Sequence, residues 1–205
     1  MKRRIKHVTV LGSGIMGSGI AAHFANIGVE VLLLDIVPFE LTEAEQKKGL
    51  TKEDKAVRNR IATESLAKLV KASPALLYKK EFAERISVGN FDDDLPKIKN
   101  TDWIIEVVVE RLDIKKSVYE KIEQFRKPGT LVSSNTSGIP INMLVEGRSD
   151  DFKKYFAGTH FFNPVRYLPL LEIIPTNDTD AEIVKFYMEY GAKFLGKTTV
   201  LAKDT

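Results

Sequence analysis

The segment covering residues 7–35 constrains the fold of this chain more than any other. Residues 7–11 (HVTVL) are a short β-branched apolar run, typical of a buried strand. Apolar residues at helical spacing follow over 15–27, and a second apolar run over 29–34 ends at Asp35. A strand, a helix and a strand within about thirty residues make a βαβ unit. Because both strands are almost continuously apolar, we expect a parallel sheet covered on both faces.

The turn between this first strand and the helix contains the pattern G-x-G-x-x-G, at Gly12, Gly14 and Gly17. Gly12 permits a tight turn, Gly14 lets the backbone approach a pyrophosphate, and Gly17 lets the helix pack close to the strand. The first helical turn, with Ile15 and Met16, offers free N–H groups and a positive dipole end to phosphates. The alternative is a purely structural glycine turn. The position of the G-x-G-x-x-G pattern between a predicted strand and a predicted helix favours a Rossmann-type dinucleotide site.

An acidic residue stands where such a site needs one. Asp35 lies 23 residues after Gly12, at the end of the second strand, where a carboxylate can accept hydrogen bonds from the adenosine ribose hydroxyls. A 2′-phosphate would be repelled there, and no Arg follows, since the next residues are Ile36 and Val37. The sequence therefore favours NAD over NADP as the cofactor.

The rest of the chain alternates strand-like and helical segments. We predict strands over 86–91, 103–109, 130–133, 155–162, 170–175 and 198–202, and helices over 114–125 and 181–194. Residues 40–85 contain 11 Lys or Arg, 8 Asp or Glu and no strand-like run, which indicates a helical insert after the second strand. The pattern predicts an α/β protein with a doubly wound, mostly parallel sheet.

Composition excludes several classes of protein. Hydrophobic residues make up 43% of the 205 residues and charged residues 29%, a balance that excludes disorder. The net charge of +3 is too weak to indicate a nucleic-acid partner. The chain has no Cys and only three His, which lie far apart in the sequence. Disulfides and thiolate zinc sites are excluded, and we expect no metal site.

The beginning of the chain has some features of a secretory signal peptide, because the basic run MKRRIKH precedes an apolar segment. However, residues 12–19 contain four Gly and two Ser, which the apolar core of a signal peptide does not. No stretch is apolar enough for membrane insertion. We predict a cytoplasmic protein, with secretion as the disfavoured alternative.

Three polar features follow predicted strands in the second half, where ligands bind in such sheets. In residues 133–138 (SSNTSG), Asn135 and Ser137 could hydrogen-bond a substrate or a ribose of the cofactor. By itself, this segment is also typical of an ordinary turn. His160 lies in or just beyond a strand, where a structural role is the usual alternative. Glu172 is a carboxylate in an apolar strand, costly unless paired. A Glu beside a His is the expected arrangement of a base and its orienting partner. We expect His7 and His23 to be structural or exposed.

Together these pieces resemble the N-terminal NAD-binding domain of L-3-hydroxyacyl-CoA dehydrogenases, enzymes of fatty-acid β-oxidation. The matching segments are GSGIMGSGIA, Asp35, VVVERLDIKK, SSNTSG, GTHFFNPV and LLEIIPT. The resemblance covers nearly the full chain and is closest to bacterial multifunctional fatty-oxidation proteins.

The resemblance implies a role for individual residues. His160 matches the catalytic base, Glu172 its carboxylate partner, and Ser137 the serine that contacts the substrate C3 oxygen and the cofactor. Glu110, Lys115 and Asn163 match positions lining the NAD site. The insert matches a helical hairpin that helps to hold coenzyme A, with Ser65, Lys68 and Lys71 near its CoA-contacting positions.

The implied activity is oxidation of L-3-hydroxyacyl-CoA to 3-oxoacyl-CoA with hydride transfer to NAD. The alternatives are a dehydrogenase for another β-hydroxy acid and a cofactor-binding module without turnover. Family members continue beyond the KDT segment into an all-helical substrate and dimerisation domain, whereas this chain ends at Thr205. We therefore expect residues 1–205 to be the NAD-binding domain of a longer protein. That protein is expected to be a homodimer or part of a multifunctional complex.

Overall fold

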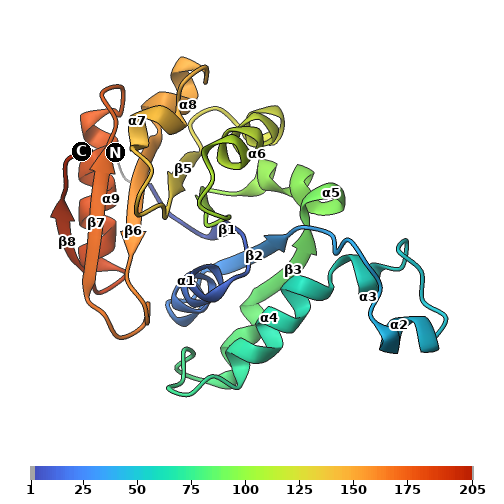
Figure 1. Cartoon of the computed structure of the whole chain (residues 1–205). Coiled ribbons are helices and arrows are strands. Elements are labelled where there is room, and N and C mark those ends of the chain that lie inside the picture. The colour runs from blue at the N-terminus through green and yellow to red at the C-terminus, as the bar shows by residue number, and fades with distance from the viewer. Residues whose placement is uncertain (1–2, 205) are drawn as a thin grey trace.

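The computed structural model describes residues 3–204 and contains one eight-stranded sheet (Figure 1). The strands are β1 (His7–Leu11), β2 (Glu30–Asp35), β3 (Ile86–Asn90), β4 (Trp103–Glu106), β5 (Leu131–Ser134), β6 (Phe156–Phe161), β7 (Leu170–Pro175) and β8 (Thr198–Leu201). The α-helices are α1 (Ile15–Asn26), α2 (Glu43–Lys47), α3 (Lys55–Arg58), α4 (Arg60–Val70), α5 (Phe91–Asp94), α6 (Leu112–Phe125), α7 (Ile141–Leu144), α8 (Asp150–Lys154) and α9 (Ala181–Lys193). Two 3₁₀ helices are η1 (Lys80–Arg85) and η2 (Leu95–Asn100).

The strand order is β3-β2-β1-β4-β5-β6-β7-β8. The first six strands of this order are parallel, in the 3-2-1-4-5-6 order of the Rossmann fold, which confirms the predicted doubly wound, mostly parallel sheet. β7 runs antiparallel to β6, because the connecting residues 162–169 are too few for a crossover between parallel strands. The carboxyl ends of β1, β4, β5 and β6 therefore meet at one edge of the sheet.

Helices cover both faces of the sheet. Side chains of α1, α4 and α9 form one buried cluster with the strands, and α6, α7 and α8 form the second. Successive residues of β4 alternate between these clusters, with Trp103 and Ile105 in the first and Ile104 in the second. Each such buried side chain contributes about 1.5–3 kcal/mol. The near-continuous apolar strands are explained by this double cover.

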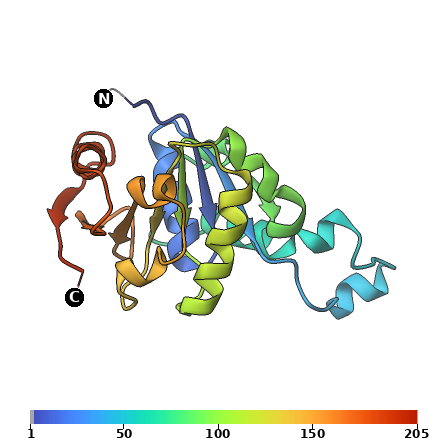
Figure 2. The same ribbon diagram turned by 90° about the horizontal axis from the view of Figure 1, so that it is seen from above.

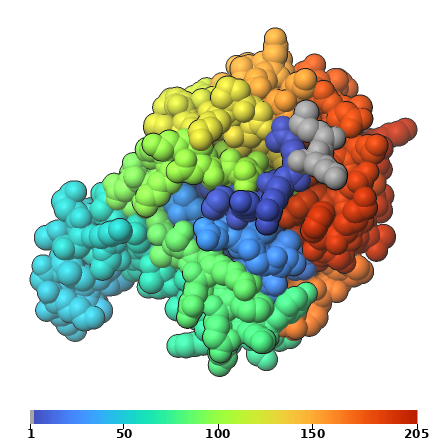
Figure 3. Space-filling model, turned by 180° about the vertical axis from the view of Figure 1, so that it is seen from behind, coloured from blue at the N-terminus to red at the C-terminus, as the bar shows by residue number. Residues whose placement is uncertain are grey.

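The predicted helical insert over 40–85 contains α2, α3, α4 and η1 and no strand. The helices of the insert differ in burial, because α4 packs against α1 and β3, whereas α2 has no buried residue. A capping box between Thr42 and Glu45 supports the first turn of α2. The α2–α3 part of the insert stands out from the body as a lobe, at the opposite end of the molecule from α9 and β8 (Figures 2 and 3).

The predicted end of the strand that begins at Trp103 is wrong by three residues, whereas the other strand ends differ by no more than one. The β-branched run to residue 109 predicts a long strand, but β4 ends at Glu106. The N–H of Val107 makes the last bond to β1, at Leu11 O, and the N–H of Val108 donates instead to the Glu106 carboxylate at 2.7 Å. The chain therefore leaves the ladder at this point. The short helices α5, η2, α7 and α8 were not expected from the sequence either. No helix within residues 3–204 has the length and apolarity to cross a membrane.

Candidate active site

The glycine turn after β1 is packed so closely that larger residues are excluded. Gly12 has φ +105°, and a Cβ on it would lie 2.5 Å from Val107 O. A Cβ on Gly17 would overlap the Gly12 carbonyl oxygen, so helix and strand approach as the spacing predicts. At Gly14, by contrast, no atom of the described residues beyond its chain neighbours and its own helix backbone lies within 4 Å of a Cβ position. The backbone at Gly14 is thus open to a ligand.

The N-terminus of α1 faces this open space. Its N-cap is Gly14, no side chain caps it, and the first turn has no acidic residue, so its N–H groups remain available to an anion. A cavity of about 370 Å³ lies beside the helix end. Its lining combines the turn (Gly14, Ile15, Met16, Gly17), the segment after β4 (Val107, Val108, Glu110, Lys115) and the segment after β5 (Asn135, Ser137). The structure therefore brings eight of the candidate residues together, since all of these lining residues except Val107 and Val108 were expected from the sequence.

Glu110 holds the loop that carries Ser137. Its Oε1 accepts hydrogen bonds from the N–H groups of Ser137 (3.1 Å) and Gly138 (3.0 Å) and from the Thr136 hydroxyl. Its Oε2 lies 3.2 Å from Lys115 Nζ. Burial raises the pKa of Glu110, but the hydrogen bonds of Thr136 and Gly138 and the Lys115 charge outweigh it, so the pKa is lowered. The carboxylate thus stays charged beside the cavity.

A buried carboxylate that the sequence analysis did not single out lies behind Lys115. Glu106 has a fully buried side chain, and its Oε1 accepts from Lys115 Nζ at 2.7 Å. Its Oε2 accepts from the hydroxyls of Tyr119 and Ser134, each at 2.6 Å. Desolvation, followed by the Glu106 charge, raises the pKa of Tyr119, which therefore remains a donor. The signal that could have found Glu106 is a charged residue inside the apolar run WIIEVVV.

Asp35 is oriented by the glycine turn itself. Its Oδ2 accepts from the N–H and the hydroxyl of Ser13, each at 2.6 Å, and its Oδ1 accepts from Ile36 N at 2.7 Å. Since a carboxylate has about four acceptor positions, one remains for a ribose hydroxyl. Ser65 of α4 lies close by, with 3.1 Å between its Oγ and Ser13 Oγ.

The two candidate catalytic side chains form a pair across the β6–β7 hairpin. His160 and Glu172 are opposite each other in the antiparallel register, and Nδ1 of the imidazole lies 2.9 Å from Glu172 Oε2. The side chains are partly exposed, at 18% and 32%, so Glu172 is less buried than an apolar strand suggests. Because a carboxylate accepts the Nδ1 proton, Nε2 carries a lone pair. The imidazole also packs on the Phe162 ring, with 4.4 Å between centroids.

The cavity and the pair are linked through Asn135. This residue lines the cavity, and its Oδ1 accepts from the N–H of Phe161, the residue after His160. Asn163, Lys68 and Lys71 are exposed, and the structure does not bring them into the cavity. Asn163 lies in the loop after β6, while Lys68 and Lys71 lie at the end of α4.

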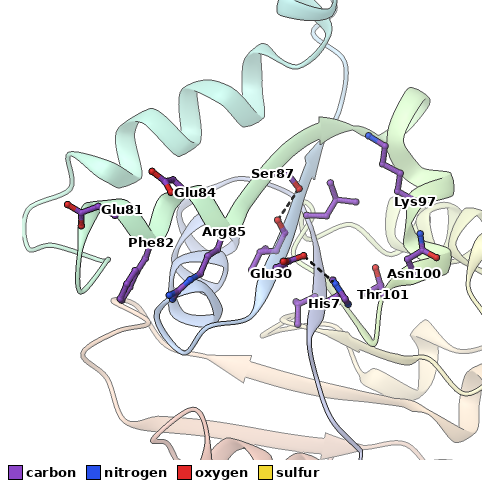
Figure 4. A pocket seen from close by; sticks show the side chains of 13 residues that line it. His7, Glu30, Glu81, Phe82, Glu84, Arg85, Ser87, Lys97, Asn100 and Thr101 are labelled. Carbon is purple, nitrogen blue, oxygen red and sulfur yellow. Dashed lines mark hydrogen bonds and ion pairs between the residues drawn. The ribbon is translucent and has the colours of Figure 1, made fainter.

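A larger cavity, of about 820 Å³, lies at the amino ends of β1 and β2, away from every candidate site residue (Figure 4). Its cationic groups already have partners: Lys97 pairs with Asp94 at 2.6 Å, and Arg85 donates to Ala25 O at 2.6 Å. The His7 imidazole lies 3.3 Å from Glu30. The smaller cavity at the glycine turn, which the candidate residues line, is therefore the better candidate for a binding site than the larger cavity.

Comparison with known proteins identifies the family. The family model described as 3-hydroxyacyl-CoA dehydrogenase, NAD binding domain, matches residues 7–205. The chain belongs to the 3-hydroxyacyl-CoA dehydrogenase family. A probable 3-hydroxyacyl-CoA dehydrogenase of Bacillus subtilis is 56% identical over 205 residues, which are 100% of this chain and 26% of that protein. A putative fatty acid oxidation complex trifunctional enzyme of Rickettsia felis is 38% identical, with the same two shares covered.

The crystal structure of FadB2 from M. tuberculosis matches with a TM-score of 0.75 and 29% identity, over 99% of this chain and 65% of that one. The chain thus spans about a quarter of the length of the two curated relatives named above. The cofactor of this 3-hydroxyacyl-CoA dehydrogenase domain is NAD. The open backbone at Gly14, the uncapped end of α1 and the Asp35 carboxylate fit the pyrophosphate and the ribose of that cofactor.

Proposed function

We propose that the protein containing this chain oxidises L-3-hydroxyacyl-CoA to 3-oxoacyl-CoA in fatty-acid β-oxidation, with NAD as hydride acceptor. The observation that carries the proposal is the 2.9 Å contact between His160 and Glu172 at the sheet edge that also bears the glycine turn. The relatives named as 3-hydroxyacyl-CoA dehydrogenases support the reaction class. The trifunctional relative supports a place in a multifunctional complex, and a homodimer remains the other expectation.

The chain's own residues would share the work as follows. His160 takes the hydroxyl proton on Nε2, and Glu172 stabilises the imidazolium that results. Ser137, on the loop held by Glu110, holds the reacting C3 oxygen. NAD accepts the hydride when it is bound. The protein's contribution is alignment and charge stabilisation.

On the cofactor side, the turn residues Gly12, Gly14, Ile15, Met16 and Gly17 would hold the pyrophosphate, and Asp35 the adenosine ribose. Glu110 and Lys115 of the cavity, together with Asn163 from the loop after β6 outside it, would line the nicotinamide half. On the substrate side, Ser65, Lys68 and Lys71 of the α4 region would contact coenzyme A. Cytoplasmic localisation stays a prediction.

The test is NADH formation by the protein containing this chain, with L-3-hydroxybutyryl-CoA as substrate. His160→Gln should lower kcat by about 10²–10⁴-fold, the usual contribution of a general base. His7→Gln is the matched control, since His7 is exposed at the start of β1, and it should keep wild-type turnover. Wild-type turnover by the His160 variant would remove the assigned base.

Two further arms separate the alternatives. Free 3-hydroxybutyrate turned over as well as the CoA thioester would indicate a different β-hydroxy acid dehydrogenase. Calorimetry on residues 1–205 alone should show NAD binding. Because this chain spans only about a quarter of the length of its two curated relatives, we expect little turnover by residues 1–205 alone, and rapid turnover would contradict that expectation.

A further inference from the structure

Among the residues that the structure describes, Lys197 is a buried cation without an anionic partner. The residue is 6% exposed and directly precedes β8. Its Nζ donates to two backbone carbonyls, those of Val165 and Leu168, the second at 2.7 Å. Within residues 3–204 no carboxylate lies at ion-pair distance from it. Burying an ammonium is costly, and an apolar side chain of similar size would avoid this cost. The position therefore calls for an explanation beyond packing.

Both acceptors of Lys197 belong to one loop, residues 162–169, which joins β6 to β7. The catalytic pair sits on these two strands, with His160 near the end of β6 and Glu172 near the start of β7. The same loop carries Asn163. A group that holds this loop thus holds the connection between both candidate catalytic strands.

The other side of the loop rests on α1 and on the end of the insert. A Cβ on Gly19 of α1 would lie 3.1 Å from a methyl carbon of Val165, so loop and cofactor helix are in close contact. Arg166 Nη1 donates to Ala75 O at 2.7 Å, and Tyr167 OH donates to the same oxygen at 2.8 Å. With these outer contacts in place, the carbonyls of Val165 and Leu168 turn inward, where they need a donor.

We propose that Lys197 is a positioning residue of the dehydrogenase, whose ammonium holds loop 162–169 against α1 and thereby sets the His160–Glu172 pair and Asn163 relative to the cofactor. The proposal rests on the proposed function above. One ammonium supplies three donors, enough for both inward carbonyls, and a charge-assisted bond to each is roughly twice as strong as a neutral one.

The surroundings of Lys197 make its charge sensitive to pH. Burial lowers the pKa of Lys197 to about 8. The titratable group that faces it from α1 is His23, whose imidazole donates to Leu195 O and is neutral near pH 7. On the loop side, Arg166 and Tyr167 point away, to Ala75. Raising the pH through about 8 therefore removes the charge from the group that holds the loop.

The test compares Lys197→Met with Lys197→Arg in the protein containing this chain. For Lys197→Met we expect kcat to fall by about 10- to 100-fold, because small misplacements of reacting groups have effects of this size. The Kd for NAD should stay within about twofold of wild type, since the glycine turn is untouched. Lys197→Arg should recover part of the lost kcat and lack the decline of activity above about pH 8 that we expect of wild type. Lys193→Met, on the exposed face of α9, is the matched control.

A second readout does not depend on activity. Trypsin cleaves after Arg166, and the wild-type loop should resist it, whereas in Lys197→Met this bond should be cut several times faster. Unchanged kcat together with unchanged cleavage in a folded Lys197→Met protein would overturn the proposal. If Lys197→Met does not fold, the pH profile of Lys197→Arg provides the test. A decline of activity above about pH 8 equal to that of wild type would then overturn the proposal. An inactive wild type would instead refute the proposed function, while the cleavage comparison would still test the loop.

Discussion

Acid should destabilise this protein through one buried imidazole, that of His23 on α1. The residue is 3% exposed, and Nε2 lies 2.8 Å from Leu195 O, so this nitrogen carries the proton. Within the described residues Nδ1 is buried without a partner. Protonating Nδ1 would create a buried, unsatisfied donor beside Lys197. Burial, partly opposed by the Leu195 bond, lowers the pKa of His23 to about 4.

The sign and size of the effect follow from linkage. The unfolded chain takes up a proton near pH 6.5 and the folded chain only near pH 4, so the free energy of unfolding falls as pH falls through this window. The full difference is about 3 kcal/mol, at about 1.4 kcal/mol per pKa unit. At about pH 5 the loss is already about 2 kcal/mol.

The assay is urea unfolding of wild type and His23→Gln between about pH 7.5 and pH 5. Trp103 is the single Trp of the chain and is buried, so its fluorescence reports unfolding. A Gln amide can donate to Leu195 O but does not titrate. Other titrating groups cancel in the difference between the two proteins, which should change by about 2 kcal/mol over this range.

Ser18→Ala is the matched control, because it changes the same helix without changing a titratable group, and its difference from wild type should be flat with pH. A flat difference for His23→Gln as well would refute the reasoning. It would mean that the folded protein accommodates the imidazolium.

The remaining predictions concern the cofactor site. Asp35→Asn should weaken NAD binding by about 1–3 kcal/mol in calorimetry, because a charge-assisted acceptor is lost; unchanged affinity would contradict the assignment. Gly14→Ala should leave the urea midpoint unchanged, since its Cβ meets no protein atom, yet abolish measurable NAD binding by filling the approach to the backbone; retained binding would place the pyrophosphate elsewhere. Glu106→Gln should destabilise the fold by about 3–5 kcal/mol, because Lys115 loses its buried partner. Glu146→Gln, which removes the exposed ion pair with Lys116, should change the free energy of unfolding by less than about 1 kcal/mol. Similar losses for the two variants would argue against a special role for Glu106.

The segments with strong local signals were predictable from the sequence. The bounds of β1 and β7 agree with the predicted 7–11 and 170–175, because apolar β-branched runs end there at Gly or Pro. The turn geometry at Gly12 and Gly17 follows from spacing alone, since each glycine answers a steric need of its immediate neighbours.

What could not be predicted depends on partners that are distant in the sequence. The buried network around Glu106 draws donors from α6 and β5, and periodicity does not reveal which helix residue turns inward. The end of β4 depends on the same carboxylate, which takes the Val108 N–H out of the ladder. The antiparallel course of β7 was foreseeable from the length of its connection, but strand patterns alone do not give direction.

The His160–Glu172 pair and the cavity at the glycine turn differ in the sequence separation of the residues that form them. His160 and Glu172 are 12 positions apart on one hairpin, whereas the cavity joins Gly14 to Ser137 across the centre of the sheet. Short-range pairs close quickly and long-range ones slowly. During folding, the His160–Glu172 pair can therefore assemble before the glycine turn and the Ser137 loop come together.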